Sequence, residues 1–282
     1  MEIRELTHEA VLSILPDRDL WGHKGTFGKI LLLCGSRGFT GAAYLAAMGA
    51  LRSGAGLTFL GVPESIYAVE AVKLNEPVVF PLPDSDGKLS LMAVSEIENR
   101  LPQMDAVLIG CGLGQSNGTL AVVKSVLENA RCPVVVDADG INVLAEHKDI
   151  LRRRTAQTIL TPHDGEFLRF GGTIGEDRMA SAAYFAREWN SIVLLKGHRS
   201  CITDGSVGYQ NLTGNPGMAV AGSGDVLAGI IVSLLGQGIS PLKAAACAAW
   251  LHGAAGDRCA KRMGQYGMLP SDMVLELPFL MK

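Results

Sequence analysis

Short apolar runs of strand length alternate with segments of helical spacing along most of this chain, and this alternation constrains the fold more than any other feature. The runs are continuously apolar, as expected for strands that are covered on both faces of a sheet. They lie at residues 29–35, 57–62, 106–111, 133–139, 158–161 and 192–196. The helical segments between them cover residues 41–53, 90–101, 118–129 and 176–190. These strand–helix units predict an α/β fold with a central, mostly parallel sheet flanked by helices.

The last third of the chain has a different pattern. Residues 200–204 and 207–211 flank a Gly-Ser pair like a hairpin with a two-residue turn, which adds antiparallel strands to the sheet. Two long apolar helices follow, at residues 224–235 and 241–262. No linker-like stretch interrupts the chain after residue 20. We therefore expect a single domain over residues 1–282, with residues 1–20 as an N-terminal extension.

Composition excludes several classes of function. The 25 Lys and Arg against 28 Asp and Glu give a formal net charge of −3, so the chain has no basic field for nucleic acid or an anionic membrane. It shows neither a signal peptide nor an apolar window long enough to span a membrane. The six cysteines lack zinc-binding spacing, and we interpret them as reduced thiols. A cytoplasmic protein is expected.

The strongest local motif runs from Asn215 to Asp225 into the start of an apolar helix. Gly222, Ser223 and Gly224 would present backbone N–H groups at the helix N-terminus, where they form an anion hole for phosphate. Asp225 repels a phosphate but accepts a proton from a hydroxyl that attacks it, and this combination suits phosphoryl transfer to an alcohol. The alternative is that Ser223 or Asp225 caps or charges the helix start while Gly222 and Gly224 serve a tight turn.

Further candidate residues follow the ends of the predicted strands, where open α/β sheets bind ligands. Asp137, Asp139 and Glu166 offer carboxylates to a hydrated Mg²⁺ ion, although we favour helix capping for Asp139. His163 is aimed at the same edge, and a structural role is the usual one for a single histidine. Lys196 ends a buried strand, so its ammonium either pairs with an acid or reaches a phosphate.

A glycine-rich run, Gly-Cys-Gly-Leu-Gly at residues 110–114, follows one predicted strand and precedes a helix. It lacks the third glycine of a dinucleotide fingerprint at the usual place, and no acidic residue follows about 20 positions later. We therefore favour a backbone surface that a ligand approaches closely over a pyrophosphate loop. The Gly-x-x-x-x-Gly-Lys-Ser/Thr pattern of a P-loop is absent from the sequence.

Together these segments resemble the ADP-dependent NAD(P)H-hydrate dehydratase family, whose members have the ribokinase-like fold. The resemblance covers residues 23–257 and rests on motifs that occur in the family's order. These motifs are HKGTFG at 23–28, GS at 35–36 with TGAA at 40–43, LRSGAG at 51–56, GCGLG at 110–114, DAD at 137–139, TPH at 161–163 with GE at 165–166, KG at 196–197, NPGMA at 215–219 and GSGD at 222–225.

The resemblance implies a nicotinamide-cofactor repair enzyme. It implies dehydration of the S epimers of NADH hydrate and NADPH hydrate to NADH and NADPH, with ADP, or alternatively ATP, as co-substrate and AMP and phosphate as products of the ADP reaction. Mg²⁺ is expected as cofactor, its protein ligands are not identified, and a homotetramer is expected. We also expect this chain to act without the N-terminal epimerase domain that many relatives carry.

Specific site residues are implied by the same resemblance. The catalytic residue would be Asp225. The hydrate would contact Ala42 or Ala43, Gly112, His163 and Asp225. The adenine nucleotide would contact Lys196, Gly197, His198, Arg199, Ser200 and Gly224. The departures from the family pattern are Asp164, where a proline is common, Ala221, where a glycine is common, and Ser223, which replaces a threonine and preserves its hydroxyl.

Two other functions share part of this evidence. A kinase of a small heterocyclic alcohol would use the same glycine-rich helix start and Asp225, and it would release a stable phosphorylated product. A nucleotide-binding module without catalysis would bind ligands and turn nothing over.

Overall fold

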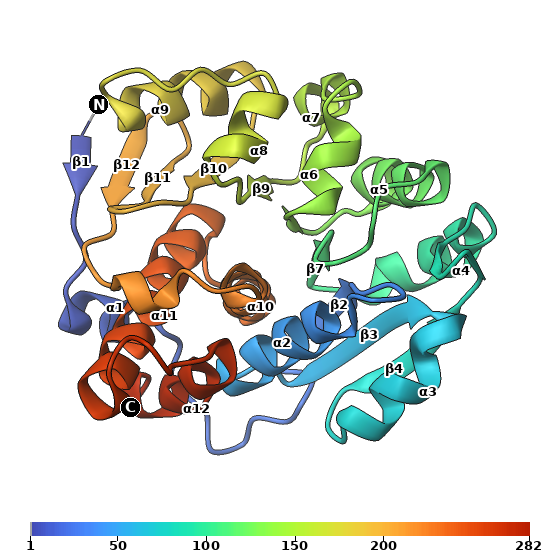
Figure 1. Cartoon of the computed structure of the whole chain (residues 1–282), viewed down its shortest axis with the longest axis horizontal. Coiled ribbons are helices and arrows are strands. Elements are labelled where there is room, and N and C mark those ends of the chain that lie inside the picture. Colours follow the sequence, from blue (N-terminus) through green and yellow to red (C-terminus); the bar gives the residue numbers. More distant parts are fainter. Residues whose placement is uncertain (1) are drawn as a thin grey trace.

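A ten-stranded sheet crosses the molecule in the computed structural model, which describes residues 2–282 (Figure 1). Its order is β1-β12-β11-β10-β9-β8-β7-β2-β3-β4. The parallel part comprises β2 (Lys29–Leu33), β3 (Leu57–Pro63), β4 (Val78–Leu82), β7 (Ala106–Ile109), β8 (Val134–Val136), β9 (Thr158–Leu160) and β10 (Ile192–Leu195). The antiparallel hairpin is β11 (Cys201–Thr203) and β12 (Val207–Gln210). The mostly parallel sheet, its six apolar strands and the hairpin are thereby confirmed.

Two strands at the edges of the sheet were not predicted. β1 (Glu2–Arg4) is exposed and pairs in parallel with β12, so the segment expected as an extension supplies an edge strand. β4 contains Pro81, which an edge strand tolerates because one side of its backbone needs no partner. A separate small hairpin joins β5 (Asp84–Ser85) to β6 (Lys88–Leu89).

Helices cover both faces of the sheet, and the strands supply side chains to both sides. Along β2, Ile30 and Leu32 join one hydrophobic core, whereas Leu31 and Leu33 join the other. The first core is covered by α1 (His8–Ile14), α2 (Thr40–Arg52), α3 (Glu64–Lys73), α10 (Ser223–Gly236), α11 (Pro241–Met263) and α12 (Pro270–Leu280). The second is covered by α4 (Ala93–Arg100), α5 (Asn117–Asn129), α6 (Asp139–Leu144), α7 (Asp149–Arg153), α8 (Asp164–Arg169) and α9 (Arg178–Glu188).

Small residues bring α2 and α10 into backbone contact. A Cβ atom added to Gly49 would collide with the main chain of Val226, and one added to Gly229 would collide with the carbonyl oxygen of Ala46. These glycines therefore allow α10 to pack deeply against α2. The position of the N-terminal end of α10 follows from this packing.

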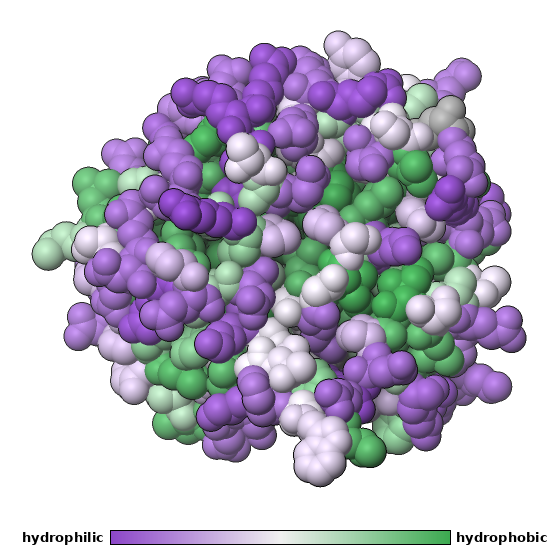
Figure 2. Space-filling view, turned by 180° about the vertical axis from the view of Figure 1, so that it is seen from behind, coloured by the Kyte–Doolittle hydropathy of each residue, from purple (hydrophilic) through white to green (hydrophobic). Residues whose placement is uncertain are grey.

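The outer surface carries mixed character. Figure 2 shows hydrophilic residues over most of the face opposite to the view of Figure 1, with hydrophobic residues gathered between them. Within residues 2–282, no helix combines the length and apolarity that crossing a membrane requires. All six cysteines are free thiols, and five of them are buried.

Candidate functional site

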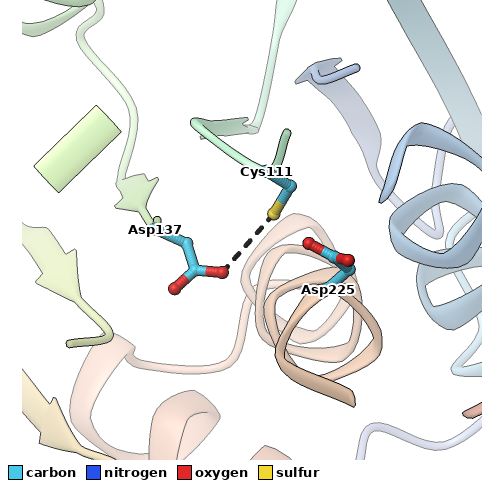
Figure 3. A group of neighbouring side chains, drawn as sticks. All are labelled: Cys111, Asp137 and Asp225. Carbon is cyan, nitrogen blue, oxygen red and sulfur yellow. Dashed lines mark hydrogen bonds between the residues drawn. The ribbon is translucent and has the colours of Figure 1, made fainter. Parts of the chain in front are cut away.

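Side chains that follow three parallel strands meet the start of α10 at the carboxyl edge of the sheet. Cys111 comes shortly after β7, Asp137 directly after β8 and Lys196 directly after β10. Asp225 projects from the first turn of α10 toward Cys111 and Asp137 (Figure 3). Cys111, Asp137 and Asp225 each have one potential ligand atom that lies within 4.8 Å of the corresponding atoms of the other two residues. The parallel strands bring together residues that are far apart in sequence.

No side chain caps the N-terminal end of α10. Gly222 precedes the helix in the left-handed region at φ +96°. Gly222 also lies against Leu45, where a Cβ would collide. Capping by the Ser223 or Asp225 side chain is therefore wrong, whereas the tight turn at Gly222 is confirmed, and the anion hole stays a prediction.

Ser223 has partners of its own. Its N–H donates to the carbonyl of Val220 at 3.3 Å, and its hydroxyl lies 3.2 Å from Nε2 of His252 in α11. The Ser223 N–H is thus engaged within the loop. The predicted anion hole would therefore depend mainly on the N–H groups of Gly222 and Gly224.

The surroundings of Asp225 disfavour the charged form of its carboxyl group. Burial and the nearby Asp137 carboxylate raise the pKa of Asp225 to about 7, although the Cys111 thiol and the Lys196 ammonium oppose the shift. Part of the Asp225 population is therefore protonated near neutral pH. A carboxylate with this pKa is a stronger base than an ordinary aspartate.

Lys196 pairs with an acid, which is one of the two roles that its position at a strand end predicted. Its Nζ donates to Oδ1 of Asp137 at 2.9 Å and lies 3.7 Å from Oε2 of Glu166. Burial disfavours the ammonium, but Asp137 and Glu166 outweigh burial and raise the pKa of Lys196. A Cβ at Gly224 would lie 3.4 Å from Nζ, so the ammonium also stands beside the start of α10.

The three carboxylates proposed for Mg²⁺ do not converge. Asp139 is the first residue of α6, and its Oδ2 accepts the N–H of Gly114 at 2.8 Å, so our preferred capping role for Asp139 is wrong. Glu166 accepts the N–H of His163 at 2.9 Å. Asp137 approaches Asp225 instead. Two carboxylates fit an ion that takes its other ligands from phosphate and water.

His163 begins α8 as its N-cap residue. Its Nδ1 accepts the N–H of Gly165 at 3.0 Å and that of Glu166 at 3.3 Å, which fixes the proton of the neutral ring on Nε2. Nε2 lies 3.4 Å from Oε1 of Glu166, and the side chain is 53% exposed. The structural role is present, and the exposed ring still borders the site.

The glycine-rich run turns through the left-handed region. Gly112 has φ +63° and lies against Ala42 and Phe39, while its carbonyl accepts the Ser36 hydroxyl at 2.7 Å. Ala43 is 0% exposed and packs in the core, so its side chain has no surface for the hydrate. Of the predicted pair, only Ala42 faces Gly112.

The segment predicted to bind the nucleotide forms the exposed turn between β10 and β11. Gly197 donates its N–H to the Ser200 hydroxyl at 3.3 Å, and Arg199 adopts φ +59°. Arg178 of α9 donates to the carbonyl of Lys196 at 3.1 Å and forms two hydrogen bonds to Asp164, at 2.8 and 2.7 Å. His198 completes the turn.

Cys111, Arg178 and His252 take part in this arrangement although the sequence did not single out their side chains. His252 is buried, and burial lowers its pKa to about 4. A histidine inside a helix otherwise rich in buried alanine is the one signal that could have identified it. Arg178 and Cys111 carry no comparable signal.

Comparison with known proteins bears on the function. The model of a family described as NAD(P)H-hydrate dehydratase matches residues 30–278. A bifunctional NAD(P)H-hydrate repair enzyme of Moorella thermoacetica is 46% identical over 99% of this chain and 54% of its own. An ADP-dependent (S)-NAD(P)H-hydrate dehydratase of Neisseria meningitidis is 36% identical over 83% of this chain and 78% of its own. The chain spans about half the length of the bifunctional relatives it matches.

Solved structures agree with the match to the NAD(P)H-hydrate dehydratase family. The ADP/ATP-dependent NAD(P)H-hydrate dehydratase of Bacillus subtilis, co-crystallised with ATP and Mg²⁺, superposes with a TM-score of 0.83 at 32% identity, over 97% of this chain and 96% of its own. A ribokinase-like superfamily protein superposes with a TM-score of 0.87. The fold is therefore ribokinase-like.

Proposed function

Because this chain belongs to the NAD(P)H-hydrate dehydratase family, we propose that its strand-end site dehydrates the S epimers of NADH hydrate and NADPH hydrate at the expense of ADP. The observation that carries the proposal is the partly buried Asp225 carboxyl, which stands in the uncapped first turn of α10 near the Lys196 ammonium. A proton acceptor beside an anion site is the equipment for transferring a phosphoryl group to a hydroxyl.

Asp225 starts the reaction by accepting the proton of the hydroxyl on the hydrated ring. The hydroxyl oxygen then bonds to the β-phosphorus of ADP as the bond to AMP breaks. The ring nitrogen's lone pair expels the new phosphate group and leaves a C=N⁺ bond. The neighbouring carbon then gives a proton to water, and the electrons of that C–H bond form the ring double bond. Phosphorylation thus converts a poor leaving group into a good one.

Lys196 and the start of α10 stabilise the negative charge that moves during transfer. The ammonium and the N–H groups near Gly224 approach the same position, and Gly224 has no side chain to fill it. Asp137 and Glu166 keep the ammonium charged and in place. The position of Lys196 beside the helix start supports a contact between its ammonium and the nucleotide phosphate.

The two substrates would lie on opposite sides of Asp225. The hydrate would contact the Ala42 and Gly112 surface and the exposed His163 ring. The adenine nucleotide would lie over the turn at residues 197–200, whose place is fixed by Arg178. ATP is proposed as an alternative co-substrate, as in the Bacillus subtilis relative.

Mg²⁺, assembly and location complete the proposal. When bound, Mg²⁺ would supply positive charge to the phosphates, and Asp137 would hold it together with phosphate oxygens and water, which leaves Asp225 free to accept the proton. A homotetramer is proposed, as the family resemblance implies, and association between copies is supported by Leu275 and Phe279 of α12, which are about half exposed. A cytoplasmic location is proposed because free cysteines persist in reducing compartments.

The test mixes the protein with the S epimer of NADH hydrate, Mg²⁺ and ADP, ATP or no nucleotide, and follows the return of reduced-nicotinamide absorbance. Nucleotide-dependent recovery is expected, together with AMP when ADP is used. A stable phosphorylated product would instead identify a kinase. Binding of both ligands without recovery or phosphorylation would contradict any transfer reaction.

A further inference from the structure

Cys111 places a thiol between the two carboxylates of the site (Figure 3). The side chain is fully buried, and its Sγ–H donates to Oδ2 of Asp137 at 3.5 Å. The steps proposed above use the charges of Asp137 and Asp225 but give no task to the sulfur atom. Its presence changes which cations this site would select.

The three donors have the geometry of one side of a tetrahedral metal site. Zinc binds sulfur at about 2.3 Å and carboxylate oxygen at about 2.0–2.2 Å, which sets a sulfur-to-oxygen separation of about 3.6 Å around one ion. The Cys111–Asp137 pair already has this separation. Asp225 belongs to the first turn of α10, and its carboxylate oxygen already lies within 4.8 Å of the other two ligand atoms. It would need to move only slightly closer to share one ion with them.

The charges around the cluster also favour a cation. Asp137 and Asp225 are like charges held close together, and metal binding would exchange the Cys111 proton for a third negative ligand. Lys196 offsets one of these charges, but it binds Oδ1 of Asp137 and leaves Oδ2 facing the sulfur. A divalent ion would relieve the remaining repulsion.

We propose that Cys111, Asp137 and Asp225 form an inhibitory site for a thiophilic divalent cation, namely Zn²⁺ or Cd²⁺. Mg²⁺ prefers oxygen ligands and would not use the sulfur, whereas thiolate ligands select the softer ions. The bound ion would take the Asp225 carboxylate and displace the Cys111 proton to solvent. The metal site rests on the cluster alone, and its inhibitory effect rests on the proposed function of Asp225.

Direct binding is measured first, with Cd²⁺ as the probe because its bond to a thiolate absorbs in the ultraviolet. Titration of the folded, full chain should produce the absorbance band with one equivalent of Cd²⁺, and Zn²⁺ should remove it by competition. Cys111→Ala should abolish the band, and Cys111→Ser should do the same if the alanine variant folds poorly. Asp225→Asn should keep the band but weaken Cd²⁺ binding about tenfold or more.

Cys247→Ala is the matched control, because Cys247 is also a buried thiol but lies in α11 beside Lys243 rather than beside carboxylates. It should leave the band intact. Cys34→Ala is a second control, because Cys34 contacts Cys111 but is not one of the three proposed ligands. It should leave the band intact as well. A band that survives in Cys111→Ala, or a wild-type protein with no band, would overturn the site.

Turnover is measured separately, as the ratio of rates with and without Zn²⁺ at saturating Mg²⁺. The wild type should lose at least about ninety per cent of its rate once the Cd²⁺-defined site is filled with Zn²⁺, and Cys111→Ser should lose less than half under the same conditions. Turnover that persists with the site filled would overturn the inhibition. A Cd²⁺ band in a protein with no turnover would contradict the proposed function and leave the metal site standing.

Discussion

The site has two sides that are held in place by different forces. On the α10 side, Ser223 and Asp225 belong to a helix that packs backbone to backbone against α2, and buried His252 supports the helix start. On the α8 side, His163 caps a short helix, and Arg178 and Asp164 form an ion pair at the surface. The α10 side is fixed by packing, and the α8 side by polar contacts that compete with water.

This difference separates chemistry from recognition. A carboxyl can be kept at a raised pKa only where the surrounding structure prevents it from moving toward water, as around Asp225. Exposed polar contacts contribute little individually, so they tolerate rearrangement around a flexible ligand. We therefore expect the α10 side to be sensitive to single substitutions and the α8 side to be tolerant.

The largest effect is expected at Asp225. Asp225→Asn should lower kcat about a thousandfold, because the amide cannot accept the hydroxyl proton, while binding of the hydrate changes little. The absorbance assay for NADH recovery measures both. Asp164→Asn on the α8 side is the control and should keep turnover within about threefold of wild type. Near-full turnover of Asp225→Asn would remove this residue from the chemistry.

The next effect is on stability at acid pH and concerns His252. Its pKa is about 4 in the folded chain and about 6.5 when unfolded, so the unfolded state binds the proton more readily. The stabilisation is complete above pH 6.5 and is lost as the pH falls toward 4. The neutral ring therefore contributes about 3 kcal/mol that acid removes.

Urea unfolding between pH 7 and pH 4 measures this contribution. His252→Gln should lose stability less steeply over that range than the wild type. Equal steepness in wild type and His252→Gln would show that the α10 side does not hold a histidine against protonation.

A smaller loss is expected from crowding the contact between α2 and α10. Gly229→Ala adds a methyl group against the Ala46 carbonyl and should lower the free energy of unfolding by about 1–3 kcal/mol. Gly41→Ala is the matched control in α2, since nothing lies within 4 Å of the added Cβ. Thermal unfolding measures both variants. If Gly229→Ala is as stable as Gly41→Ala, the contact is not as close as described.

The smallest effect is expected at the Asp164–Arg178 ion pair. Its side chains are 52% and 26% exposed, so Arg178→Gln should lower the free energy of unfolding by less than about 1 kcal/mol. Urea unfolding at neutral pH measures this change. A loss above about 2 kcal/mol would mean that the α8 side depends on single contacts as strongly as the α10 side does.

The fold was largely predictable from local pattern. Strands such as β2 and β7 are covered on both faces, so their sequences are continuously apolar and easy to identify. β1 is short, charged and exposed, and its pairing with β12 depends on a distant partner that no local pattern reveals. The short helices α6 and α7 have too few residues for a clear period.

The site was predictable where it depends on strand ends. Parallel strands place their carboxyl ends at one edge, which brought Asp137 and Lys196 together as expected. Tertiary contacts set the rest: His252 reaches Ser223 from another helix, and Asp139 bonds a loop instead of capping its own helix. The individual binding roles of the predicted residues stay predictions.

The pairing of β1 with β12 also bears on how the chain reaches its final form during synthesis. Glu2 pairs with Val207, so roughly 200 residues separate the two partners. At about 5–20 residues per second, a ribosome makes the second partner about 10–40 s after the first. β1 can therefore pair with β12 only late in synthesis. β2 and β3, which are close together in the sequence, can pair early.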